Sequence, residues 1–197
     1  MYSAIDDAYR ELENEFRLVK EFLNVVNLQE ARTHIRASRP IAVFRDNVGP
    51  VRKEVVDYVR VLVQDALQMV IVLCVSRLES FLRVFWEERV GEISKPDRTL
   101  FSNPRKFAGE FAGEAGEKKG VLLFVDEAVK NDAQAVVQER HVLVHNGGKI
   151  DDNAIKQFEK AGRYGFKSGD KLQLSVDLVR RDIKCIESFV SSVRGVE

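Results

Sequence analysis

The feature that most limits the fold is an apolar stretch in the middle of a long helical pattern. Residues 66–75, ALQMVIVLCV, lie inside a helical repeat that runs over about 51–90. A helix that is apolar nearly all round has to be covered on several sides, which is typical of the central helix of a bundle. The run is far shorter than the roughly 20 residues that a membrane span needs, so we expect a core helix and no membrane.

Helical patterns also dominate the rest of the chain. Residues 2–36 carry apolar side chains at mixed three- and four-residue steps, which predicts a long amphipathic helix. Residues 121–145 predict another helix, which ends at the glycines that follow it. Aspartates at 151 and 152 can cap a short helix that ends near 161, and Ser175 can cap a final helix over about 176–193.

Residues 91–120 are the irregular part of the sequence. They are rich in glycine and proline and predict an insert between the second and third helices. A short strand pattern at KLQLS is the only competitor to helix, and no repeat or linker divides residues 1–197. The prediction is therefore one all-α domain, a single helical bundle.

Charge and cysteine content restrict the class of protein. The 31 lysines and arginines equal the 31 aspartates and glutamates, so any site for a polyanion has to be a local patch. Cys74 and Cys185 lie in apolar helical patterns and are too few for a zinc motif or a disulfide framework. The acidic, polar N-terminus is unlike a signal peptide, and we expect a cytoplasmic protein.

The stretch QERHVLVHNGG places a cation where an apolar side chain is expected. Arg140 lies near the centre of the apolar stripe of its helix, and an arginine there needs an anionic partner, either a carboxylate of this protein or a bound phosphate. His145 lies about 140° around an ideal helix from Arg140, but the Asn-Gly-Gly exit leaves it free to turn. An arginine beside a histidine is a suitable phosphate-binding and acid–base pair.

This Arg-x4-His pattern resembles the motif of the HEPN superfamily, many of whose members are metal-independent endoribonucleases. ERHVLVHNGGKID, together with SRLESFLRVFWEE and GDKLQLSVDLVRRDIKCIESFV, looks like the RiboL-PSP-type HEPN group over roughly 55–193. The family often has asparagine directly after the arginine, where this chain has His141. The resemblance implies a homodimer whose active cleft lies between the two protomers.

The mechanism implied by the resemblance fits the chemistry of these residues. RNA carries its own nucleophile, the 2′-hydroxyl, so His145 would act as the base and Arg140 would hold the phosphate as negative charge develops. His141 and Asn146 are candidates for holding substrate, and Glu79 resembles an acidic residue of the family that could orient Arg140. Cleavage would need no metal or other cofactor. Such domains are frequent in toxin–antitoxin and anti-phage systems, which suggests an antitoxin or another regulatory protein as partner.

Each of these assignments has an alternative. Arg140 could pair with a core carboxylate, His145 could be a hydrogen-bonded helix terminator, and Glu79 could pair with Arg83 one turn later. His141 and His145 have the spacing with which one helix presents two imidazoles to a metal, although no third ligand is evident. A non-catalytic HEPN scaffold that dimerises or binds RNA or a nucleotide is the alternative function.

A basic run offers one further RNA-binding candidate. Between residues 31 and 45 the chain has no acidic residue and could contact RNA phosphates through Arg32, Arg36, Arg39 and Arg45. The same run could equally be a solvated helix end. A second and weaker candidate is the set Lys167, Lys171, Arg180, Arg181 and Lys184.

Overall fold

A computed structural model describes residues 4–38, 48–89 and 125–194, and within them the chain is all-α. The helices are α1 (Ala4–Ser38), α2 (Val48–Arg89), α4 (Glu127–His145), α5 (Asp152–Lys160) and α6 (Val176–Arg194). They pack into one bundle, which confirms the predicted fold class. The described ranges contain no strand, and KLQLS contributes only an isolated bridge between Lys149 and Lys171. The predicted insert over 91–120 lies outside the described residues.

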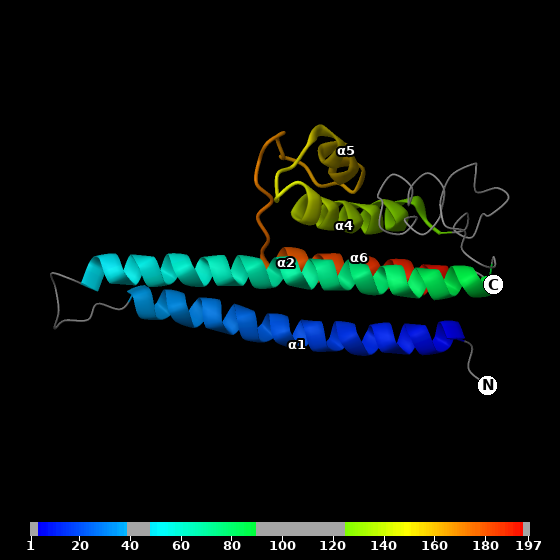
Figure 1. Ribbon diagram of the computed structural model, residues 1–197, viewed down its shortest axis with the longest axis horizontal. Coiled ribbons are helices and arrows are strands. Elements are labelled where there is room, and N and C mark those ends of the chain that lie inside the picture. The colour runs from blue at the N-terminus through cyan, green and yellow to red at the C-terminus, as the bar shows by residue number, and fades with distance from the viewer. Residues whose placement is uncertain (1–3, 39–47, 90–124, 195–197) are drawn as a thin grey trace.

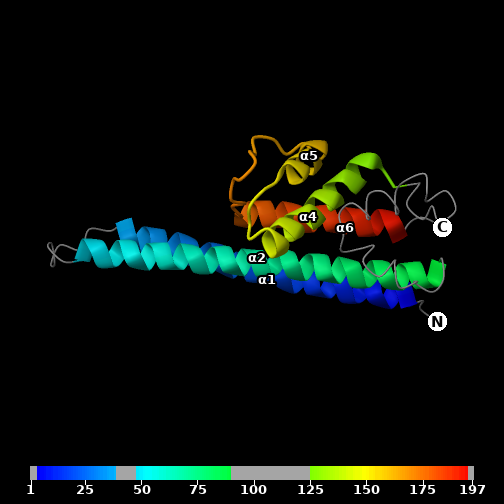
Figure 2. The same cartoon turned by 45° about the horizontal axis from the view of Figure 1, so that its top comes forward.

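The bundle is built around α2, as the apolar repeat predicts. α1 runs antiparallel to α2, so that the backbone N–H of Ala4 donates to the Glu88 carboxylate over 2.8 Å. Figure 1 shows α4 on the side of α2 away from α1, with α5 beyond α4. α6 lies behind α2 in this view and contacts α1 as well, for example through Lys20 and Glu187. Figures 1 and 2 both show the pair of α1 and α2 extending past the other helices, at the end where α1 finishes and α2 begins.

The core is formed by apolar side chains from all of these helices. Those that are almost completely buried include Phe16, Leu23, Ile71, Phe81, Phe85, Phe158 and Phe189. Cys74 is part of this core, and burial raises the pKa of its thiol to about 12. Cys185 is only partly buried, so the prediction that both cysteines are core residues holds fully for Cys74 alone.

One face of α2 is not covered by the described helices. Tyr58, Val61, Leu62, Met69 and Leu73 are exposed, with Met69 at 73%. The segment Asp57–Glu88 is long and apolar enough to cross a membrane, by length and composition only, and 28% of its most apolar window is buried. Core helices of soluble proteins meet the same criterion. The predicted central place of this helix is therefore confirmed, but the expected burial of the apolar run 66–75 is only partial within the described ranges.

Side-chain caps fix the helix starts near the motif. α4 begins at Glu127 and not at 121, because Asp126 accepts a hydrogen bond from the N–H of Ala128 over 2.8 Å. Asp151 caps α5 by accepting from the N–H of Ala154 over 2.7 Å. Ser175 accepts from the N–H of Leu178 over 3.1 Å, as its sequence position predicts. The caps at 151 and 175 are thus confirmed, while the predicted start of the third helix was too early.

Candidate functional site

His145 is the last residue of α4 and is exposed to solvent. The helix stops there because the N–H groups of Asn146 and Gly148 both donate to the Val142 carbonyl, over 3.2 and 3.0 Å. Gly147 and Gly148 have φ values of +59° and +80°, the left-handed region that favours glycine. The Asn-Gly-Gly sequence thus ends the helix as predicted and leaves the imidazole at its tip.

Arg140 lies one turn before this end, on a part of α4 that faces α2. It is half-buried, and its Nε is buried with no hydrogen-bond partner. Oε1 of Glu79, on α2, is also buried without a partner. Burial raises the pKa of Glu79, while attraction to Arg140 and, more weakly, to Arg83 lowers it. Glu79 therefore interacts with Arg140 more strongly than with Arg83, but does not satisfy the buried Nε–H.

The two motif histidines lie beside each other at the helix end, where His145 is exposed and His141 is partly buried. The ring centroids of His141 and His145 are 4.9 Å apart, with an angle of 44° between the planes. Any group that reaches one imidazole is therefore close to the other. The described residues contain no cluster of three or more metal-ligating side chains, so these ranges supply no third ligand to the histidine pair.

Asn146 has a structural partner that sequence reasoning missed. Its Nδ2 donates to Oδ2 of Asp151 over 3.0 Å, while Oδ1 of the same aspartate caps α5. Asn146 therefore links the end of α4 to the start of α5. This contact ties the turn after His145 to the rest of the domain, whether or not Asn146 also contacts substrate.

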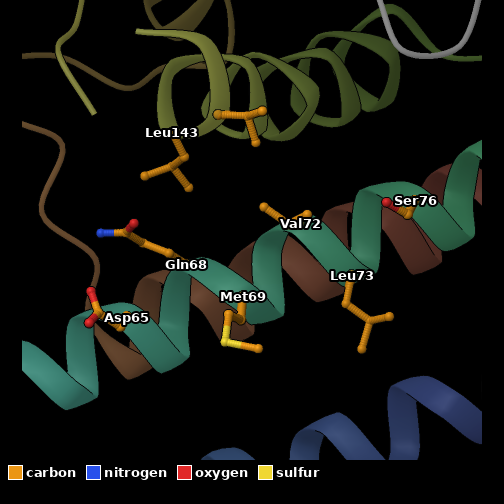
Figure 3. Close-up of a pocket in the computed structure, with 8 residues that line it drawn as sticks. Asp65, Gln68, Met69, Val72, Leu73, Ser76 and Leu143 are labelled. Atoms are coloured by element: carbon orange, nitrogen blue, oxygen red, sulfur yellow. The ribbon is translucent and has the colours of Figure 1, made fainter. Parts of the chain in front are cut away.

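A groove of about 510 Å³ runs between α2 and the C-terminal turn of α4. In Figure 3, Gln68 and Val72 point from α2 toward Leu143, while Met69 and Leu73 point to the side on which α1 lies. The other lining residues are Asp65, Ser76 and Val144. Val144 is 47% exposed and directly precedes His145, so the groove opens beside the motif.

A buried ion cluster on the face of α4 that meets α6 was not predicted. Arg163, in the link between α5 and α6, donates through Nη1 to Glu139 Oε1 and through Nη2 to Asp182 Oδ1, the latter over 2.8 Å. The residues Arg163, Glu139 and Asp182 are 5%, 1% and 0% exposed. The argument that a buried arginine needs an anionic partner, either a carboxylate or a phosphate, was made for Arg140, and Arg163 is the arginine for which the structure shows carboxylate partners.

Burial and the neighbouring charges shift the pKa of each group in this cluster. Burial raises the pKa of Glu139 well above its ordinary range, and the neighbouring carboxyl of Asp182 raises it further, although Arg163 lowers it. Burial also raises the pKa of Asp182, while Arg163 and a hydrogen bond from Glu139 lower it. Burial lowers the pKa of Arg163, but the two carboxyl groups raise it more. A proton on Glu139 would leave one negative charge opposite one guanidinium.

The basic run lies largely outside what the structure describes. Arg32 and Arg36 fall within α1, but their side chains are outside the described residues, and so are Arg39 and Arg45 altogether. In the second basic set, Arg180 hydrogen-bonds to Asn24 over 2.6 Å and Arg181 lies 3.8 Å from Asp182. These two arginines therefore already have partners within the protein.

Comparison of the chain with protein-family models, with curated proteins and with solved structures finds no match to any of them. The comparisons consequently support no family assignment. The functional argument depends on the residues themselves and on their arrangement at the end of α4.

Proposed function

We propose that this chain is a metal-independent endoribonuclease of the HEPN type, with Arg140 and His145 as its catalytic residues. His145 accepts the proton of a 2′-hydroxyl, whose oxygen attacks the adjacent phosphorus while the bond to the 5′-oxygen breaks. Arg140 stabilises the charge on the phosphoryl oxygens, and the departing 5′-oxygen takes up a proton. The products carry a 2′,3′-cyclic phosphate and a 5′-hydroxyl.

The main support for this proposal is the difference between Arg140, on α4, and Arg163, in the link between α5 and α6. Arg163 donates hydrogen bonds to two carboxylates. The guanidinium of Arg140, in contrast, has a buried Nε–H without a hydrogen-bond partner, and it lies on the helix that ends at the exposed His145. An unpaired buried donor is costly, and a phosphate oxygen would satisfy it. Glu79 would then orient Arg140, and His141 lies close enough to His145 to contact the same substrate.

A homodimer is the second part of the proposal, and the exposed apolar surface supports it. Leu18, Phe22 and Val25 on α1 are 44–56% exposed, and Met69 and Leu73 on α2 lie beside the motif groove. Apolar patches of this kind on a soluble protein mark interaction surfaces. A second copy placed here would bring its own Arg140 and His145 toward the same cleft. We also propose a cytoplasmic toxin or anti-phage role, with a regulatory protein as partner.

Cleavage of a defined RNA tests the nuclease. We expect activity in a strong chelator, cyclic phosphate ends, and no cleavage of DNA or of RNA with methylated 2′-hydroxyls. Arg140→Ala and His145→Ala should each lower the rate by about 10²-fold or more, the scale of a lost acid–base or charge-stabilising group. Arg83→Ala is the matched control, since Arg83 also acts on Glu79 but is exposed and outside the motif. Its rate should be that of the unaltered protein.

Several outcomes would contradict the mechanism. Cleavage of methylated RNA at an undiminished rate would exclude attack by the 2′-hydroxyl. Activity that a chelator abolishes and zinc restores would favour a metal site at the two histidines. Rates equal to those of the unaltered protein in both Arg140→Ala and His145→Ala would leave the non-catalytic scaffold as the better reading.

The dimer has its own test. Light scattering should give about twice the chain mass of 22.4 kDa, and Met69→Lys should shift the protein toward the monomer and lower cleavage with it. Tyr164→Lys provides the control, because Tyr164 is 74% exposed but lies in the link between α5 and α6. A Met69→Lys variant that remains dimeric would show that the dimer interface lies elsewhere. If the unaltered protein is a monomer that binds lipid vesicles, a membrane and not a second copy covers this face.

A further inference from the structure

Arg163 joins elements that are distant from one another in the sequence. Its backbone N–H donates to the Phe158 carbonyl over 2.8 Å, and Phe158 is completely buried, so the link after α5 is fixed at this point. From there the guanidinium reaches Glu139 on α4 and Asp182 on α6. The cluster therefore holds α4 against α6 through bonds of defined direction, whereas the surrounding apolar contacts have none.

Glu139 and Arg140 are adjacent, and they face different partners. Glu139 binds Arg163 on the side of α6, while Arg140 interacts with Glu79 on α2. Neighbouring residues of a helix are about 100° apart, so one rotation of α4 moves both side chains together. At a radius of about 6 Å from the helix axis, a rotation of about 10° displaces a side-chain group by about 1 Å.

A buried ion cluster is a poor source of stability. The loss of hydration offsets most of the attraction between the charges, and apolar side chains of similar volume often stabilise a protein as well or better. Orientation is what such a cluster provides and apolar packing does not. Displacement of a reacting group by about 1 Å can lower a catalysed rate by about 10²-fold.

We propose that Arg163 is a positioning residue, which by binding Glu139 and Asp182 sets the rotation of α4 and so the placement of Arg140 and His145. This inference rests on the proposed ribonuclease function. Arg163 itself is buried and does not line the groove, so we assign it no direct contact with RNA.

The test replaces the cluster with apolar residues in the full-length chain. The triple variant Glu139→Met, Arg163→Leu, Asp182→Leu should unfold at the same temperature as the unaltered protein or higher. Its kcat for RNA should nevertheless fall by about 10- to 100-fold with little change in KM. Lys20→Met is the matched control, because it removes an ion pair between α1 and α6, Lys20 to Glu187 at 2.6 Å, without touching α4.

A second readout separates failure of this inference from failure of the nuclease. The side-chain Nε–H signal of Arg140, assigned with Arg140→Lys in ¹⁵N-labelled protein, should shift in the triple variant and stay in place in Lys20→Met. That shift is measurable even if the unaltered protein cleaves no RNA. A folded triple variant with unchanged signal and unchanged kcat would overturn the inference.

If the triple variant does not fold, Arg163→Lys decides the matter. Lysine keeps the charge but cannot donate along two fixed directions to both carboxylates. We expect a shifted Arg140 signal and a lower kcat in Arg163→Lys. An unchanged signal and rate in this variant would likewise refute the positioning role.

Discussion

Replacing Arg163 by methionine should destabilise the protein strongly and in a pH-dependent manner. Methionine keeps most of the buried stem, so the main loss is the charge that faces Glu139 and Asp182. Leaving a buried charge without its partner costs about 3–5 kcal/mol. We expect about 3 kcal/mol near neutral pH, the lower end of this range, because burial holds the pKa of Glu139 well above its ordinary range and so favours its uncharged form. For a chain of this size the midpoint of thermal unfolding should fall by about 6–12 °C.

The direction of the pH effect follows from the two carboxyl groups. The folded pKa values of Glu139 and Asp182 are raised above their values in the unfolded chain, so the stability that these groups contribute is full below the unfolded pKa values. It is lost as pH rises through the folded pKa values. Removing Arg163 removes an interaction that lowers both pKa values. The difference between the variant and the unaltered protein should therefore be small in acid and grow as pH rises.

Denaturant unfolding at mildly acidic and mildly alkaline pH measures both quantities. Arg181→Met is the control, because Arg181 also lies 3.8 Å from Asp182 but its side chain is 49% exposed. Such a pair contributes less than about 1 kcal/mol. Equal losses in Arg163→Met and Arg181→Met, or a loss in Arg163→Met that does not change with pH, would refute the assignment of a buried charge cluster.

Two further predictions concern the backbone and core that support the motif. Gly147→Ala should lower the free energy of unfolding by about 1–2 kcal/mol, because a φ of +59° strains a residue with a Cβ even where that Cβ meets no atom; a thermal midpoint equal to that of the unaltered protein would argue against this turn. Phe158→Ala should cost about 3–5 kcal/mol by opening a cavity under α5, and denaturant unfolding that shows a loss below about 1 kcal/mol would mean that this side chain is not in the core.

The sequence predicts the helices well because periodicity and caps are local properties. The apolar repeat gives α2 its central place, and Ser175 marks a helix start by its position alone. The sequence leaves the cap of α5 open between Asp151 and Asp152, and the structure shows that it is Asp151. The predicted start of α4 was too early because the apolar residues before Asp126 extend the pattern, and only the cap contact shows where the helix begins. An apolar pattern in the sequence can continue past the end of a helix. The boundary itself is marked by the hydrogen bond of the capping side chain, here Asp126.

The candidate site was predictable only in part, for a different physical reason. Arg140 and His145 are visible because a cation interrupts an apolar stripe beside a helix stop. Arg163 lies in the glycine-containing turn AGRYG, which resembles an exposed loop, and Glu139 has an ordinary polar position in its helix. Burial of a charged residue requires a partner, and the partners Glu139 and Asp182 come from separate helices. Such a cluster is defined by the tertiary fold and leaves no local signal.

The exposed apolar stripes on α1 and α2 link the behaviour of this protein to its abundance. If a partner covers these stripes in the folded chain and does not bind the unfolded chain, the folded state gains stability in proportion to the logarithm of that partner's concentration. If the partner is a second copy, dilution alone should lower the melting temperature and the fraction of chains that form the proposed cleft between two protomers. A cell that kept such a chain scarce would then hold it inactive, without any inhibitor, until its synthesis rose.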